Sequence, residues 1–182
     1  NQNTESLLQG VSDRNILSYY PLSLPLVEDL INKIEKNITL DELRKDKRGF
    51  LMENTSSETQ LNNKENIFLR QLTDDFLIKQ LTFLDGTKAV NVLYPILTNI
   101  LNNLKLSHTK QFVVKFIVHS AFVIERCIKK EFLEYPDLNL FLKENGETIS
   151  IIEKEFVKVE ETFGIKIPLS ELAYISDIFI QS

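Results

Sequence analysis

Both histidines of the chain, His108 and His119, fall in one stretch of apolar and basic residues. Its apolar side chains are dense and its polar ones recur three, four or seven positions apart, which predicts a helix over residues 107–130. At about 100° per residue, the two histidines lie roughly 20° apart around this helix, and Lys115 and Arg126 lie within about 40° of His119. A neutral imidazole flanked by cations suits a phosphoryl acceptor. We therefore take His119 as the candidate acceptor, with Lys115 and Arg126 as its phosphate environment.

Simpler interpretations stand beside this one. A single histidine on an apolar helix usually fills a core or boundary position. We expect Ser107 to cap the helix and His108 to be a solvated residue of its first turn. The two histidines are separated by about 16 Å along the axis, so they cannot share a metal ion. We expect Cys127 to be a small buried hydrophobe, because it lies about 80° from His119 and cannot pair with it as a nucleophile.

Other charged residues have simple structural interpretations. Glu125 and Arg126 would by default form a surface pair. The adjacent carboxylates Asp74-Asp75 and Glu160-Glu161 lack a matching base or metal partner, so we assign them to the surface. The chain shows no glycine-rich phosphate loop, no Cys/His metal spacing and no serine nucleophile elbow. The sequence therefore predicts no enzymatic activity, no cofactor and no metal site.

Chain length, net charge and cysteine content limit the class of protein. The chain has 182 residues, enough for one good core, and a net charge of −5, which argues against general nucleic-acid affinity for this fragment. A single cysteine cannot form an internal disulfide, which favours a reducing cytosol. Lys115 and Glu125 interrupt the most apolar run, so we expect no membrane span and a cytoplasmic location.

The first part of the chain is expected to be short helices and irregular segments. Apolar spacing predicts a helix over residues 22–34, and Thr39 with Glu42 fits a capping box that would start another. Residues 53–66 have almost no large apolar side chains, so they are expected to form a linker or mobile loop. We expect residues 1–70 to be the tail of a preceding region and a connector.

From residue 67 onward the helical pattern tightens. Asp85 is expected to cap a helix, Pro95 to kink or break it, and Gly164 to end a later one. A short helix is expected from Pro136 or Asp137 to near residue 145. The main helices are predicted over residues 67–83, 85–104, 107–130, 148–163 and 171–180. No segment alternates with a period of two, so the sequence predicts an all-α fold, a compact bundle of about five helices over residues 71–182.

Four segments of this part resemble a known family: FLDGTKAVNVLYPILTNIL, FIVHSAFVIERCI, EYPDLNLFL and VEETFGIKIPLSELAYI. In order and spacing they look like a PTS regulation domain (PRD), an all-helical module through which the sugar phosphotransferase system controls bacterial transcription. The resemblance covers about residues 76–180. It is strongest to the last such domain of sigma-54-dependent activators of the levanase- and mannose-operon regulator type.

This resemblance implies a function for the candidate residues. The family's phosphorylated histidine corresponds to His119. A second acceptor histidine, which many members carry in the last helix, is replaced here by Ile178. The resemblance implies a regulatory domain of a transcriptional activator, phosphorylated on one histidine by an enzyme IIB of the mannose or fructose class or by HPr, and a homodimer. The unphosphorylated form would be the active one.

Two other functions stay open on the sequence. One is a helical module for oligomerisation or partner binding that works without phosphorylation. The other is an RNA antiterminator domain, against which the missing second histidine argues.

Overall fold

The computed structural model describes residues 24–46 and 57–181, and within these ranges all regular structure is helical. The predicted all-α class is confirmed. The helices are α1 Leu24–Asp46, α2 Ser57–Leu72, the π-turn η2 Thr73–Leu77, α3 Ile78–Gln80, α4 Gly86–Leu104, α5 Lys110–Lys129, α6 Leu138–Phe163 and α7 Leu169–Ile180. None of the described helices is both long and apolar enough to cross a membrane.

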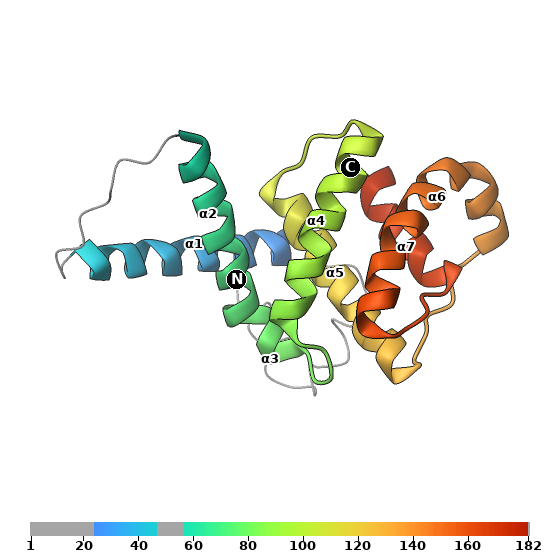
Figure 1. Cartoon of the computed structure of the whole chain (residues 1–182), viewed down its shortest axis with the longest axis horizontal. Helices are drawn as coiled ribbons and strands as arrows, with labels where there is room; N and C mark the ends of the chain where they lie inside the picture. Colours follow the sequence, from blue (N-terminus) through green and yellow to red (C-terminus); the bar gives the residue numbers. More distant parts are fainter. Residues whose placement is uncertain (1–23, 47–56, 182) are drawn as a thin grey trace.

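Helix α5 is the centre of the bundle. It packs against α1, α4 and α7, and α6 lies against α4 and α7. In Figure 1, α1 and α2 lie at one end of the molecule and α6 and α7 at the other, with α4 and α5 between them. A helix that is apolar on nearly every side must be covered on every side. This explains why the most apolar segment of the sequence occupies the core.

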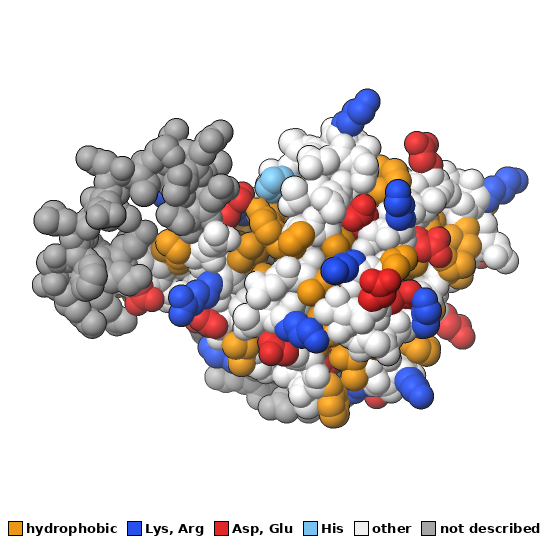
Figure 2. Space-filling model, viewed as in Figure 1, with side chains coloured by type: hydrophobic (Ala, Val, Ile, Leu, Met, Phe, Trp, Pro, Cys, Tyr) orange, Lys and Arg blue, Asp and Glu red, His pale blue; other side chains and the backbone are white. Residues whose placement is uncertain are grey.

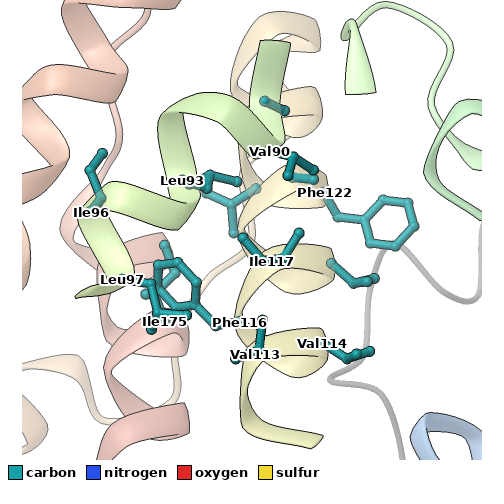
Figure 3. Packing of buried hydrophobic residues seen from close by; sticks show 14 of the residues in the cluster. Val90, Leu93, Ile96, Leu97, Val113, Val114, Phe116, Ile117, Phe122 and Ile175 are labelled. Atoms are coloured by element: carbon teal, nitrogen blue, oxygen red, sulfur yellow. The ribbon is translucent and has the colours of Figure 1, made fainter. Parts of the chain in front are cut away.

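Aromatic and aliphatic side chains from three helices meet at the middle of α5. Figure 3 shows Leu97 of α4, Phe116 of α5 and Ile175 of α7 converging in this layer. Phe116 also makes edge-to-face contacts with Phe156 of α6 and Phe179 of α7, at 6.1 and 5.6 Å between ring centroids. Edge-to-face packing fits the aromatic quadrupole, so these contacts fix the orientation of α7 on α5.

The N-terminal part differs from the prediction. Helix α1 is a single helix, and Thr39 lies inside it, where its hydroxyl donates to the Glu35 carbonyl at 3.0 Å. The predicted capping box at Thr39 is therefore wrong, because the buried face of α1 keeps the helix continuous. That face is formed by Val27, Leu30, Ile31 and Ile34.

The predicted linker is also wrong over residues 57–66, which are helical in α2. Propagating a helix costs little once one end is docked, and the buried residues Phe68, Leu69 and Leu72 dock this one. The predictions for residues 1–23 and 53–56 lie outside the described residues.

Several helix ends follow the sequence signals. Asp85 caps α4, accepting the Lys88 N–H at 3.0 Å, and Gly164 ends α6 with φ of 65°. The short helix and the next one are merged as α6, with a non-helical Asn145 between them. Helix α4 runs through Pro95 without a break.

The start of α5 corrects one prediction. Thr109, not Ser107, is the cap, and its hydroxyl oxygen accepts the Phe112 N–H at 3.2 Å. His108 therefore precedes the helix instead of lying in its first turn. Both hydroxyl residues suit a cap, and the sequence alone does not choose between positions two residues apart.

Candidate functional site

His119 lies near the middle of α5, turned toward α7, and its ring is 6.5 Å from that of Tyr174. The side chain is only 7% exposed, and its buried Nε2 has no hydrogen-bond partner among the described residues. Burial, with a smaller contribution from the positive charge of Arg126, lowers the pKa of His119 to about 3. The imidazole is therefore neutral at pH 7 and keeps a nucleophilic lone pair.

Arg126 forms a buried ion pair with Glu171 of α7. Its Nε lies 2.9 Å from Glu171 Oε1 and one terminal nitrogen lies 2.5 Å from Oε2, a two-pronged contact. The side chains are 3% and 0% exposed. Charges so deeply buried are stable only when paired, so the first turn of α7 is fixed to the end of α5. The default prediction of a surface pair between Glu125 and Arg126 is wrong.

Glu125 instead binds the loop before α4. Its carboxylate accepts the backbone N–H groups of Thr82 at 2.9 Å, Phe83 at 3.1 Å and Leu84 at 2.8 Å. These donors come from a loop without regular hydrogen bonds of its own, which a buried carboxylate satisfies. The adjacent residues Glu125 and Arg126 thus tie α5 to two distant parts of the chain.

Three hydrogen bonds join one face of α7 to the loop between α5 and α6. Glu171 Oε1 accepts the Leu133 N–H at 2.9 Å, the Tyr174 hydroxyl donates to the Glu134 carbonyl at 2.8 Å, and the Tyr135 hydroxyl donates to Asp177 at 2.8 Å. The α7 residues are spaced by three, so they share a helix face, and their partners are consecutive. We call these three bonds the α7 latch.

The structure brings Arg126 close to His119 but separates His108 from it. His108 lies in the loop before α5, 40% exposed, with Nε2 3.8 Å from a Glu65 carboxylate oxygen. It lines a cavity of about 560 Å³ between α1, α2, α4 and the start of α5. Lys115 is half-buried one turn before His119, with no ion pair among the described residues. No group of three metal-ligating side chains occurs in the described ranges.

Residues 95–182 match the PRD domain family. This part of the chain belongs to that family. The chain is 31% identical over 122 residues to the transcriptional regulatory protein LevR of Bacillus subtilis, covering 65% of this chain and 13% of LevR. It is 18% identical over 156 residues to the transcriptional regulatory protein DagR of Salmonella typhimurium, covering 84% of this chain and 16% of DagR. No solved structure matches the chain significantly.

Within the PRD domain, Cys127 is buried as predicted, and burial raises the pKa of its thiol to about 12. It is therefore a protonated thiol at pH 7, as suits a small hydrophobe. Ile178 is half-buried beside Asp177.

Sequence reasoning missed the partners of this site. Neither Glu171 nor Tyr135 was assigned a contact from the sequence. One signal could have found them: in the mostly apolar last helix, Glu171, Tyr174 and Asp177 recur every three residues. That spacing marks a polar face that needs hydrogen-bonding partners elsewhere in the PRD domain.

Proposed function

We propose that this chain is a regulatory domain of a bacterial transcription regulator, controlled by phosphorylation of His119 by the sugar phosphotransferase system. The PRD match supports the regulatory role, and both relatives are named as transcriptional regulatory proteins. Because the matched region spans 13% and 16% of those relatives, it would be one part of a much longer regulator. A sigma-54-dependent activator of the levanase type is the form we propose.

One observation carries the acceptor role: a neutral, buried imidazole whose Nε2 has no partner lies near a fixed cation. The Nε2 lone pair would attack phosphorus, forming an N–P bond while the bond from phosphorus to the donor side chain breaks. The electron pair of the broken bond returns to the donor, and Nδ1 gives up its proton so that the phosphorylated ring is not left as a cation. Since His119 is 7% exposed, the site must open for the donor.

The product needs positive charge. A phosphoryl group carries about −1.5 to −2 charges at pH 7, and such a charge is costly in a buried position unless cations pair with it. Arg126 is already in the site, and Lys115 lies one helical turn from His119. We therefore assign both to the phosphate environment.

The donor would be an enzyme IIB of the mannose or fructose class, or HPr. When sugar passes through the transporter, phosphoryl groups are drained from these donors, so the unphosphorylated domain would be the active state. The domain would act as a homodimer in the cytoplasm and would catalyse no reaction itself. The face shown in Figure 2 mixes acidic and basic side chains, so it offers no broad basic surface to nucleic acid.

The test is phosphorylation in vitro followed by intact-mass measurement. The protein is incubated with phosphoenolpyruvate, enzyme I and HPr, with and without a mannose-class enzyme IIB. We expect one acid-labile phosphoryl adduct that His119→Ala loses and His108→Ala keeps, which makes the exposed histidine a matched control. An adduct that persists in His119→Ala would overturn the assignment.

A phosphorylation-independent interaction module is the second candidate. Two large apolar side chains near the start of α4, Ile78 and Phe83, are 54% and 64% exposed. Such side chains can serve as contacts for a partner. Absence of any adduct under all these conditions would favour this function.

A further inference from the structure

We propose that Glu171 is a positioning residue that binds Arg126 while His119 is unmodified. When His119 is phosphorylated, Arg126 binds the phosphoryl group instead, and the loss of its ion pair with Glu171 opens the α7 latch. This inference rests on the proposed function, because it describes how phosphorylation of His119 would be transmitted to the rest of the domain. It follows from three features of the site: its charges, the shared oxygen of Glu171 and the single face of α7.

The first feature is the balance of charge between Arg126, Glu171 and a phosphoryl group on His119. Arg126 and Glu171 form a buried pair with no net charge, and each is almost inaccessible to solvent. A phosphoryl group on His119 would place a second, more highly charged anion beside the same guanidinium. Two buried anions repel each other, and the fork of an arginine binds phosphate as well as it binds carboxylate. The phosphoryl group therefore competes with Glu171 for Arg126.

The carboxylate of Glu171 has two attachments that share an atom. Its Oε1 accepts both from Arg126 Nε and from the Leu133 N–H, each at 2.9 Å. A carboxylate that loses its guanidinium cannot remain 0% exposed without a large desolvation cost, so it must move toward water. That movement removes the acceptor of the Leu133 N–H.

The third feature, the single face of α7, transmits the movement of Glu171 to the loop between α5 and α6. Glu171 lies in the first turn of α7, on the face that also presents Tyr174 and Asp177 to the 133–135 backbone and to Tyr135. Tyr174 in turn lies against the ring of His119. Displacing Glu171 therefore loosens the loop between α5 and α6 and the contact that Tyr174 makes with that loop.

The decisive measurement is amide hydrogen exchange on the whole chain, before and after phosphorylation. Exchange at Leu133 should become at least about tenfold faster in the phosphorylated protein, because its amide loses its acceptor. The amides of Thr82 and Leu84, which Glu125 holds on the other side of α5, are the internal control and should not change. Phosphorylation of His119 with unchanged exchange at Leu133 would overturn the inference and leave the proposed function intact.

Variants test the competition itself. Glu171→Gln keeps the size and the acceptor oxygen but removes the charge that competes for Arg126. The equilibrium constant for phosphoryl transfer from the donor to His119 should therefore be about tenfold larger in this variant than in the wild-type protein. It is measured from the phosphorylated fraction at equilibrium with a limiting donor. Glu171→Asp keeps the charge and should stay near the wild-type value. Glu160→Gln is the matched control, since Glu160 also accepts a backbone N–H, from Ile167, and pairs with Lys166.

Each outcome decides something. Equal equilibrium constants for Glu171→Gln and Glu160→Gln would contradict the competition. If Glu171→Gln fails to fold, the exchange measurement on the wild-type protein decides alone. Absence of any adduct on His119 would overturn the proposed function and this inference together.

Discussion

The neutral state of His119 is set by its surroundings. Burial disfavours the imidazolium ion, and the guanidinium of Arg126 adds to the effect, so the pKa falls from 6.5 to about 3. A protonated imidazole has no free lone pair and cannot accept a phosphoryl group. The same environment that hides the acceptor therefore keeps it chemically competent across the physiological pH range.

This low pKa predicts how stability depends on pH. In the unfolded chain His119 takes up a proton as pH falls through about 6.5, whereas in the folded state it does not until about 3. The unfolded state then binds more protons, so folding stability is complete above pH 6.5 and falls below it. Between pH 6.5 and 5 the loss from this residue should be about 2 kcal/mol. Urea unfolding at a series of pH values measures it.

The comparison that isolates this effect uses two variants. His119→Gln should lose this part of the pH dependence, while His108→Gln, changed at an exposed position, should retain it. A wild-type protein and a His119→Gln variant with parallel stability curves between pH 5 and 6.5 would contradict the prediction.

At the scale of elements, local signals predicted the helices well where the ends are set by local chemistry. Asp85 and Gly164 each mark a helix end, because capping and left-handed backbone depend on the residue itself. The capping box at Thr39 failed because burial of the α1 face outweighs a local signal. The linker over 57–66 failed because composition does not reveal that a polar helix continues from a docked end.

In the candidate site, too, local features were predicted from the sequence and contacts between distant elements were not. Residues on one helix can be aligned from spacing alone, and so His119 and Arg126 were found together. Their partners lie in other elements: Glu171 is 45 residues beyond Arg126, and the loop bound by Glu125 lies 41 to 43 residues before it. Helical periodicity contains no information on such pairings, which arise only when α5 is surrounded.

The attachment of the 82–84 loop to α5 can be tested at Glu125. Glu125→Ala would leave three backbone N–H groups without their acceptor, and we expect the free energy of unfolding to fall by at least about 2 kcal/mol. Glu144→Ala, at an exposed position in α6, should change it by less than about 0.5 kcal/mol. Urea denaturation of both variants measures the difference, and equal effects would show that the carboxylate does not hold the loop.

For the whole molecule, the open question is whether the N-terminal helices belong to the same folding unit as the PRD domain. The domain boundary proposed at residues 70 and 71 would fall inside α2, between the buried side chains of Leu69 and Leu72. Helix α1 packs against both α2 and α5, and its apolar face forms part of one cluster with the bundle core. These contacts favour a single cooperative unit over a separate connector.

Substitutions at a pair of isoleucines distinguish a single folding unit from a separate N-terminal connector. Ile34 of α1 is 0% exposed and Ile78 of α3 is 54% exposed. If α1 shares the core, Ile34→Ala should lower the free energy of unfolding of the entire chain by about 2 to 4 kcal/mol, whereas Ile78→Ala should change it by less than about 0.5 kcal/mol. Exchange protection of the α5 amides should fall in parallel with Ile34→Ala. Unchanged protection in α5 would instead mean that α1 unfolds by itself, and the boundary near residue 70 would then be supported.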